Sequence, residues 1–268
     1  MRIALGQLEM CWEDKRASLK KVEEFIRQAA AQQGEMILFP EMSLTGFSMD
    51  LNKIGEVPDH SETVLQMQKL ALKYRIAIGF GWAALPEAGQ KKGTNRFTLV
   101  DEQGQIIGQY TKLHPFRYGG EADIYQGGNK LVCVPYKGHV VGLFICYDLR
   151  FPEIFQAASQ KADVMIVIAD WPASRRDHWL TLLKARAIEN QAYVAGINCV
   201  GSLGGLEYSG DSSIIAPDGT ILATSHGQES VTVCDIGEDV WSLRRHFPTK
   251  ADRRNDLYIR ELERISSE

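Results

Sequence analysis

Three side chains that could take part in acid–base or nucleophilic chemistry each follow an apolar run of the chain. Glu41 follows "ILFP", Lys112 follows "IIGQYT", and Cys146 follows "VVGLFI". In an α/β protein, ligands bind at the carboxyl ends of strands, where polar side chains can converge without disturbing the core. We therefore expect these three groups to meet at one site.

A carboxylate, an amine and a thiol at one site predict a cysteine nucleophile. A thiol with a pKa of about 8.5 is mostly protonated at neutral pH, so it needs a neighbouring base or positive charge. Glu41 can act as that base, and Lys112 can stabilise a developing oxyanion. Taken alone, each residue also has a structural interpretation. Cys146 could be a packed core cysteine, Glu41 a charge at a helix N-terminus and Lys112 a solvated lysine in a turn. For Cys133, Cys199 and Cys234 we keep the packing interpretation.

Composition restricts the partners of the chain. It is 44% hydrophobic and 24% charged, with a formal net charge of −4 and a pI near 5.9. Because no long basic block is present, neither nucleic acid nor an anionic membrane surface is a favoured partner. No run of about 18 apolar residues occurs, and the first residues do not read as a leader peptide. We expect a cytoplasmic protein that acts on small molecules.

The cysteines and histidines predict no disulfide, metal or cofactor. The five cysteines contain no C-x-x-C pair, and the six histidines contain no H-E-x-x-H motif. The stretch "GFGWAA" at 79–84 fits a dinucleotide fingerprint of the form G-x-G-x-x-A. Pro86 follows at once, however, and prevents the helix that such a fingerprint needs.

Short apolar runs alternate with amphipathic stretches up to about residue 200, which is typical of an α/β protein. We predict helices at 15–33, 61–75, 152–160, about 175–191 and 251–265. The predicted strands lie at 3–9, 36–40, 76–83, 96–101, 105–111, 130–136, 139–146, 163–169, 192–199, 212–216, 219–224 and 230–235.

The number of strands and their turns predict the layers of the fold. The turns "DEQGQ", "YKGH" and "APDGT" indicate hairpins, so antiparallel pairs are mixed with crossover connections. About a dozen strands exceed what one open sheet usually carries, which favours two packed sheets with helices outside. No linker interrupts the chain, and we predict one domain over residues 1–268. The charged tail, 241–268, is expected at a subunit interface.

The motifs "FPEMSLTG", "YTKLHPF" and "FICYDLRFPE" resemble, in this order, the Glu, Lys and Cys motifs of the nitrilase superfamily of carbon–nitrogen hydrolases. The resemblance covers nearly the full chain. It implies a four-layer αββα sandwich that forms homodimers. It also implies that Glu41 is the general base, Lys112 the oxyanion stabiliser and Cys146 the nucleophile, with Glu121 as a second glutamate that orients the lysine. The backbone N–H of Tyr147 is expected to assist Lys112.

A second segment concerns the substrate. Ser174 and Asp177 have the spacing of a capping box, which predicts a helix with Arg175 and Arg176 in its first turn. Cations are unfavourable there, so either a bound carboxylate or a solvated turn explains them.

The runs "ADWPASR" and "KARAIENQAYVAG" resemble the omega-amidase branch. That resemblance favours Arg175 over Arg176, and implies a substrate such as 2-oxoglutaramate or 2-oxosuccinamate. Phe116, Tyr147 and Trp171 are expected to line the pocket with Arg175. The loop between Lys112 and Tyr125 is shorter than the one expected of the animal type and looks more like that of bacterial members, and it is expected to line the pocket.

Several alternative functions stay open at this stage. Within the same superfamily they are a deaminated-glutathione amidase, an N-carbamoyl-amino-acid hydrolase and a true nitrilase. A glutaminase half of a synthetase would need a separate partner chain. A binding subunit without activity would keep the fold, but the three intact motifs argue against it.

Overall fold

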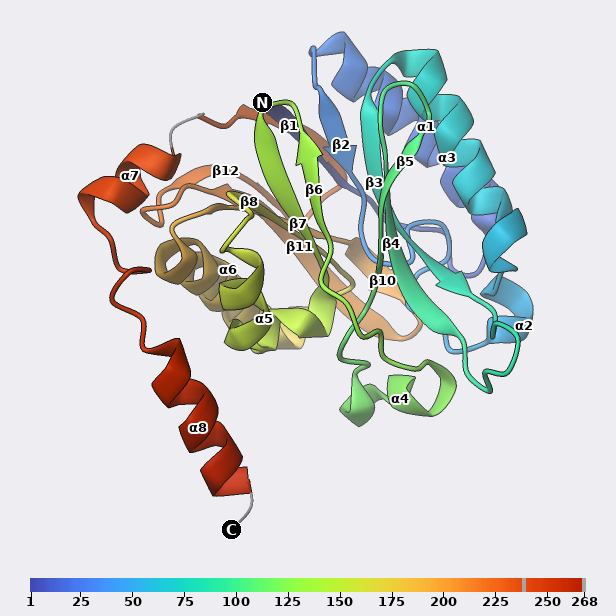
Figure 1. Cartoon of the computed structure of the whole chain (residues 1–268). Coiled ribbons are helices and arrows are strands. Elements are labelled where there is room, and N and C mark those ends of the chain that lie inside the picture. Colours follow the sequence, from blue (N-terminus) through green and yellow to red (C-terminus); the bar gives the residue numbers. More distant parts are fainter. Residues whose placement is uncertain (238–239, 267–268) are drawn as a thin grey trace. The chain divides into compact units, whose positions relative to one another are not determined.

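The computed structural model describes residues 1–237 and 240–266 (Figure 1). Contacts within the chain define two compact units, one ending at residue 238 and one beginning at residue 239. All residues that the sequence assigns to the site lie in the first unit.

The first sheet of this unit has six strands in the order β13-β1-β2-β3-β4-β5. The neighbours β1, β2 and β3 are parallel, and the other pairs are antiparallel. The strands are β1 (Arg2–Gln7), β2 (Met36–Leu38), β3 (Ala77–Ala84), β4 (Thr94–Val100), β5 (Ile106–Thr111) and β13 (Ser230–Asp235).

The second sheet has seven strands in the order β10-β11-β9-β8-β7-β6, with β12 paired to β11. Here β7, β8 and β9 are the parallel neighbours, again surrounded by antiparallel pairs. The strands are β6 (Cys133–Tyr136), β7 (His139–Ile145), β8 (Val164–Ala169), β9 (Tyr193–Asn198), β10 (Val200–Leu203), β11 (Leu206–Ile215) and β12 (Ile221–His226).

Helices cover the outer face of each sheet (Figure 1). Helices α1 (Lys15–Ala31) and α3 (Glu62–Tyr74) pack on the first sheet, and α5 (Pro152–Ala158) and α6 (Arg176–Asn190) pack on the second. The shorter segments of this unit are α2 (Leu51–Ile54), α4 (Glu121–Ile124) and the 3-10 turns η1 (Pro58–His60), η2 (Arg117–Gly119), η3 (Cys146–Arg150) and η4 (Ala173–Arg175).

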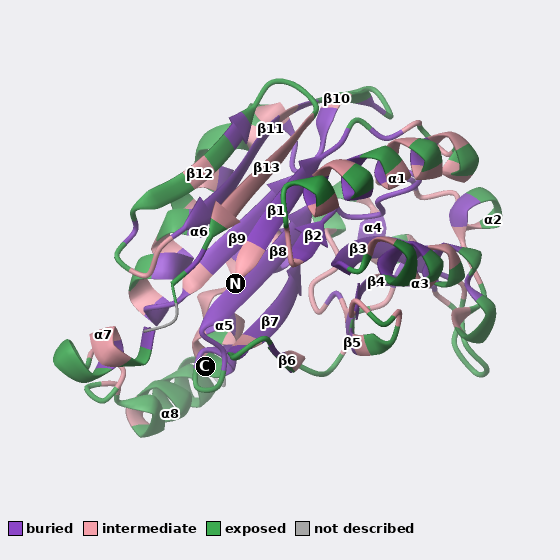
Figure 2. Ribbon diagram, turned by 90° about the horizontal axis from the view of Figure 1, so that it is seen from above, coloured by how far each residue is buried: buried purple, intermediate pink, exposed green. Residues whose placement is uncertain are grey.

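Alternating side chains of the strands explain the four layers. In β1, Ile3 and Leu5 join the core between the two sheets, whereas Ala4 joins the core beneath α1. This is the period of two that a strand buried on both faces requires. Figure 2 shows the central strands buried and the outer faces of α1 and α3 exposed. The predicted αββα sandwich of two mixed sheets is confirmed.

Helix starts follow local capping chemistry. Asp14 caps α1 by accepting a hydrogen bond from the backbone of Ala17, and Ser61 caps α3 by accepting one from Val64. The predicted cap at Ser61 is therefore present. Pro152 occupies the first turn of α5, where its missing N–H has no consequence.

The C-terminal unit contains α7 (Val240–His246) and α8 (Asn255–Ser266). The predicted helix 251–265 corresponds to α8, which begins four residues later than expected. A single domain over residues 1–268, and the placement of 241–268 at a subunit interface, stay predictions.

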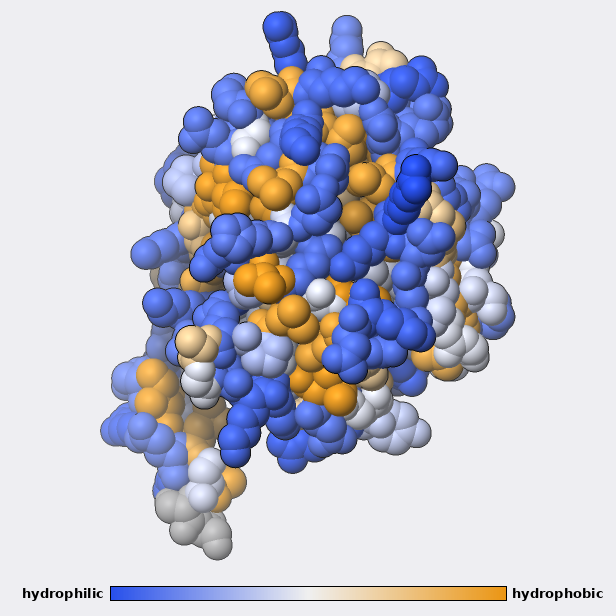
Figure 3. Space-filling view, turned by 90° about the vertical axis from the view of Figure 1, so that its right-hand side faces the viewer, coloured by the Kyte–Doolittle hydropathy of each residue, from blue (hydrophilic) through white to orange (hydrophobic). Residues whose placement is uncertain are grey.

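The surface carries mixed polar and apolar side chains. Figure 3 shows hydrophilic side chains interspersed with apolar ones on the face that lies to the right in Figure 1. Within residues 1–237 and 240–266, no helix combines the length and apolar character needed to span a membrane.

Candidate active site

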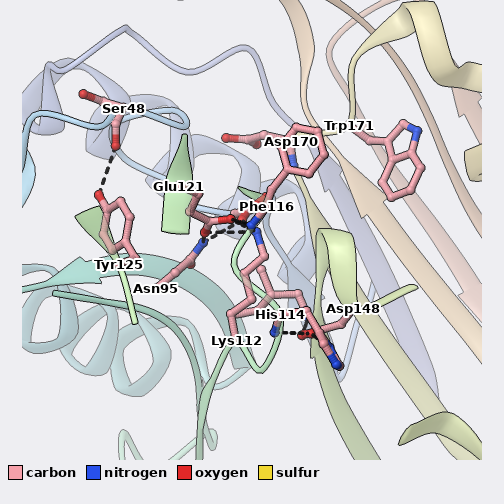
Figure 4. A network of polar contacts seen from close by, with 12 residues as sticks. Ser48, Asn95, Lys112, His114, Phe116, Glu121, Tyr125, Asp148, Asp170 and Trp171 are labelled. Atoms are coloured by element: carbon pink, nitrogen blue, oxygen red, sulfur yellow. Dashed lines mark hydrogen bonds and ion pairs between the residues drawn. The ribbon is translucent and has the colours of Figure 1, made fainter. Parts of the chain in front are cut away.

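Glu41, Lys112 and Glu121 form one buried ion-pair network, in which Figure 4 labels Lys112 and Glu121. Glu41 follows β2, Lys112 follows β5, and Glu121 begins α4. The Lys112 Nζ lies 2.8 Å from Oε1 of Glu41 and 2.8 Å from Oε2 of Glu121. At most 1% of each of these side chains is exposed, so water does not screen the charges. The structure thus joins three residues that the sequence assigned to one site.

Asn95 in β4 connects the two carboxylates directly. Its Nδ2 donates to Glu41 Oε1 at 2.6 Å and to Glu121 Oε1 at 2.9 Å. Its backbone carbonyl also accepts a hydrogen bond from the backbone N–H of Lys112, at 2.9 Å. Sequence analysis missed Asn95, because an asparagine within an ordinary strand pattern carries no local signal.

Cys146 is the first residue of η3, at the sharp turn that follows β7. Its φ is +45°, a left-handed conformation that a non-glycine residue adopts at a cost of about 1–3 kcal/mol. Asp148 stabilises this turn, because its carboxylate accepts hydrogen bonds from the backbone N–H of Ile145 and the hydroxyl of Tyr110. The same carboxylate binds the backbone N–H and the Nδ1 of His114. Asp148, a polar residue of the cysteine motif, therefore stabilises the turn that carries the thiol.

Burial and the neighbouring charges determine whether the resting Cys146 thiol is protonated. Burial, followed by the charge of Glu41, raises the pKa of the Cys146 thiol well above its usual range, and the charge of Lys112 acts in the opposite direction. Among the neighbouring charges, that of Glu41 acts most strongly on this thiol. Burial disfavours the charge on Lys112, but Glu121 and Glu41 outweigh it and raise the pKa of Lys112 well above its usual range. The resting site therefore contains a neutral thiol beside a cationic lysine.

A cavity of about 190 Å³ opens beside Cys146. It is smaller than the roughly 300–1,000 Å³ of pockets for drug-sized ligands, so it suits a small substrate. The residues that line it are Phe47, Met49, Phe116, Gly119, Cys146, Tyr147, Arg150, Asp170, Trp171, Pro172, Arg175, Leu206 and Tyr208. All four residues expected to line a substrate pocket, Phe116, Tyr147, Trp171 and Arg175, are among them.

Two guanidinium groups line this cavity. Arg175 lies over the ring of Phe116, with Cζ 5.3 Å from the centroid, and Arg150 lies 4.8 Å from the centroid of Trp171. The sequence pointed to Arg175 but missed Arg150, although Arg150 belongs to the cysteine motif. Arg176 instead binds Asp211 through Nε and Nη2, at 2.8 and 2.9 Å. Arg176 therefore has a structural partner outside the cavity lining.

The predicted capping box at Ser174 and Asp177 is wrong. The 3-10 turn η4 spans Ala173–Arg175 and leads directly into α6, so that Arg175 occupies the N-cap position. Among the described residues, no side chain caps this helix start. A 3-10 turn and a capping box begin with similar residue types, and only the backbone path of the whole segment distinguishes them.

The part of the chain that the structure describes contains no cluster of three His, Cys, Asp or Glu side chains that could hold a metal ion. His114 and His178 each contact another side chain. His114 binds Asp148, and the Nδ1 of His178 lies 3.1 Å from Nη2 of Arg150.

Comparison with known proteins identifies the family. Residues 2–245 match the family model described as carbon-nitrogen hydrolase. The chain belongs to the carbon–nitrogen hydrolase family. This hydrolase is 38% identical over 257 residues to omega-amidase YafV of Escherichia coli (strain K12), covering 94% of this chain and 96% of that protein. It is 33% identical over 260 residues to 2-oxoglutaramate amidase of Bacillus subtilis, covering 96% and 98%.

A solved structure extends the comparison to three dimensions. XC1258 from Xanthomonas campestris, described as a CN-hydrolase superfamily protein with an arsenic adduct in its active site, is 30% identical. Its TM-score with this hydrolase is 0.88, over 94% of this chain and 97% of that one. The family predicted from the three motifs is confirmed.

Proposed function

We propose that this hydrolase cleaves the terminal carboxamide of a small 2-oxo acid, such as 2-oxoglutaramate or 2-oxosuccinamate, to the dicarboxylate and ammonia. The observation that carries this proposal is the buried Glu41–Lys112–Glu121 network beside Cys146, at a small cavity with two guanidinium groups. The names of the relatives in Escherichia coli and Bacillus subtilis support the same activity.

The first half of the reaction forms a thioester. Cys146 Sγ attacks the amide carbon while Glu41 takes the thiol proton, because the resting thiol is neutral and Glu41 is the charged neighbour that acts most strongly on it. The carbonyl oxygen becomes an oxyanion, stabilised by the cationic Lys112 and by the backbone N–H of Tyr147. Glu41 then gives the proton to the leaving nitrogen, the C–N bond breaks and ammonia departs.

The second half hydrolyses the thioester. Water attacks the thioester carbon while Glu41 takes one of its protons, and the same oxyanion donors act again. When the C–S bond breaks, the proton on Glu41 returns to Cys146, which restores the resting site. Glu121 and Asn95 keep Lys112 and Glu41 in place during both steps.

The far end of the substrate is a carboxylate that Arg175 and Arg150 can bind. Both guanidinium groups lie against aromatic rings of the cavity wall, which limits their rotamers before a ligand arrives. A guanidinium fork matches a carboxylate in geometry and charge. A neutral amide of the same length lacks this interaction and should bind more weakly.

Mass spectrometry of the protein mixed with a slow amide substrate tests the proposal. We expect Cys146 to gain the mass of the acyl group, on the peptide that contains residue 146. Turnover of 2-oxoglutaramate should exceed that of deaminated glutathione, a carbamoyl amino acid and a nitrile. If any of these three compounds is turned over faster than 2-oxoglutaramate, the proposed substrate is wrong. If Cys146 stays unmodified, the proposed thioester is wrong.

We also propose a cytoplasmic homodimer. Cell fractionation tests the compartment, and light scattering of the purified chain tests the assembly. A monomer at micromolar concentration would contradict the dimer.

A further inference from the structure

Four tyrosines are buried within residues 1–237 and 240–266, and one of them, Tyr208, differs from the others in its hydroxyl group. The other three each donate a hydrogen bond from the hydroxyl to an oxygen of the protein, namely Tyr110 to Asp148, Tyr125 to Ser48 and Tyr136 to Glu102. A buried tyrosine hydroxyl usually finds such a partner. Among the described residues, no group accepts a hydrogen bond from the hydroxyl of Tyr208.

The hydroxyl of Tyr208 is open to the cavity beside Cys146. Tyr208 lies in β11 and belongs to the cavity lining, with 6% of the residue exposed. Its Oη is not one of the side-chain atoms of the described residues that are both fully enclosed and without a partner. Tyr147, the other tyrosine of the lining, is only partly buried, so water can bind its hydroxyl. Tyr208 therefore offers the cavity a buried hydroxyl that a ligand can reach.

The surrounding fold holds this tyrosine in place. Its ring packs with Leu203 in one apolar cluster, and Tyr208 pairs with Gly201 across the antiparallel strands β10 and β11. The next residue, Ser209, accepts a hydrogen bond at its carbonyl from the backbone N–H of Gly227, at 2.9 Å. A donor that is fixed before the ligand arrives loses little conformational freedom on binding.

The hydroxyl of Tyr208 stays protonated and lies near the reacting groups. Burial, followed by the charge of Asp170, raises the pKa of Tyr208 above its usual range. Cys199, Cys146 and Glu41 act in the same direction, and the last two are the proposed nucleophile and base. A neutral hydroxyl in this place can donate one hydrogen bond to an oxygen of the substrate.

We propose that Tyr208 is a substrate-binding residue, and that its hydroxyl donates a hydrogen bond to the 2-oxo oxygen of the substrate. This inference rests on the proposed function, because it takes the amide of a 2-oxo acid as the substrate. The amide oxygen already has Lys112 and the backbone N–H of Tyr147 as donors, and the carboxylate has the two guanidinium groups. The 2-oxo oxygen is the remaining acceptor, and a neutral hydroxyl suits a neutral ketone.

A pair of substrates that differ in one group tests this contact. Tyr208→Phe removes the hydroxyl and keeps the ring. Glutaramate has a methylene group where 2-oxoglutaramate has the oxo group, and both carry the same amide and carboxylate. In Tyr208→Phe we expect kcat/KM to fall about three- to tenfold for 2-oxoglutaramate, the range for a lost neutral hydrogen bond, and to stay within about twofold for glutaramate.

Tyr136→Phe is the matched control. Tyr136 is also buried, but its hydroxyl donates to Glu102 and it lies outside the cavity lining. Tyr136→Phe should lower Tm, because it removes a hydrogen bond within the protein, and should leave kcat/KM for both substrates unchanged. Tyr208→Phe should keep the Tm of wild type or raise it. A lower Tm in Tyr208→Phe would mean that the hydroxyl has a partner in the protein, which contradicts the inference.

Two kinetic results would overturn the inference. Equal losses of kcat/KM on 2-oxoglutaramate and glutaramate would mean that Tyr208 acts on the amide, on the carboxylate or on the shape of the cavity. An unchanged kcat/KM on both substrates would mean that the hydroxyl binds no substrate group.

Calorimetric binding of the same two amides to Cys146→Ala, with and without Tyr208→Phe, gives a readout that needs no turnover. We expect Tyr208→Phe to weaken the binding of 2-oxoglutaramate about three- to tenfold and that of glutaramate by less than about twofold. If wild type hydrolyses neither amide but this difference in binding is found, the proposed function fails and the recognition of a 2-oxo group stands. If wild type hydrolyses 2-oxoglutaramate and Tyr208→Phe changes neither kinetics nor binding, this inference fails and the proposed function stands.

Discussion

A single residue, Lys112, faces the negative charges of both Glu41 and Glu121 in the site. It is a buried cation between two buried carboxylates, and Lys112→Met would leave Glu41 and Glu121 together without a partner. We expect kcat for 2-oxoglutaramate to fall about hundredfold or more, because one oxyanion donor is worth about 2.7–4 kcal/mol. The free energy of unfolding should fall by about 3–5 kcal/mol. Lys91→Met, at an exposed position, serves as the control and should change neither quantity.

We expect Arg175 to favour amides that carry a carboxylate. Arg175→Leu removes a guanidinium from the cavity and keeps apolar bulk against Phe116. We expect kcat/KM for 2-oxoglutaramate to fall about tenfold to a hundredfold, the range for a lost hydrogen bond to a charged group. The kcat/KM for a neutral primary amide such as butyramide should stay within about twofold. Equal losses on both substrates would contradict carboxylate binding by Arg175.

At the scale of elements, β3 supports the segment that carries Glu41. Gly81 lies in this strand, and a Cβ atom there would come within 2.5 Å of the Met42 backbone nitrogen and 2.9 Å of the Glu41 Cα. Backbone atoms cannot move aside as a flexible side chain can. Gly81→Ala should therefore displace Glu41, and we expect kcat to fall by about a hundredfold for a shift near 1 Å.

A strand glycine away from Glu41 provides the control for this substitution. A Cβ atom at Gly142 in β7 would meet the Phe144 side chain first, at 3.2 Å. Gly142→Ala should therefore keep kcat much closer to wild type. Equal losses of kcat in the two variants would show that the effect is general to the sheets and not specific to Glu41.

At the scale of the whole molecule, several buried groups stay protonated in the folded state. Burial is the largest cause that raises the pKa of Cys146, Cys199 and Tyr110 well above their usual ranges. In the unfolded chain, thiols ionise near pH 8.5 and tyrosines near pH 10. Above about pH 8.5 the folded state therefore holds more protons than the unfolded state, and stability falls as pH rises.

Thermal unfolding at alkaline pH tests this linkage. We expect Tm to fall steadily between pH 8.5 and pH 10.5, and to fall less steeply in Cys199→Ala, which lacks one of the linked protons. A Tm that is flat or rising over this range would contradict the protonated state of these groups.

The sequence by itself determined the family, the two packed sheets and the residues of the three motifs. Glu41, Lys112 and Cys146 were found because each stands directly after an apolar strand pattern, and such patterns are local properties of the chain. Their roles in catalysis stay predictions. The expected helix start at Ser174 failed for the opposite reason, since a local residue pattern did not reveal the turn that precedes α6.

Only the tertiary structure decided which distant residues surround these three. Asn95 meets Glu41 and Glu121 through the pairing of β4 with its neighbours, and Asp170 meets Glu41 across 129 positions of the chain. Arg150 and Arg175 line one cavity although they lie on different segments. These contacts depend on sheet order and on the packing of two sheets, and nonlocal packing of this kind leaves no periodic pattern around the residues concerned.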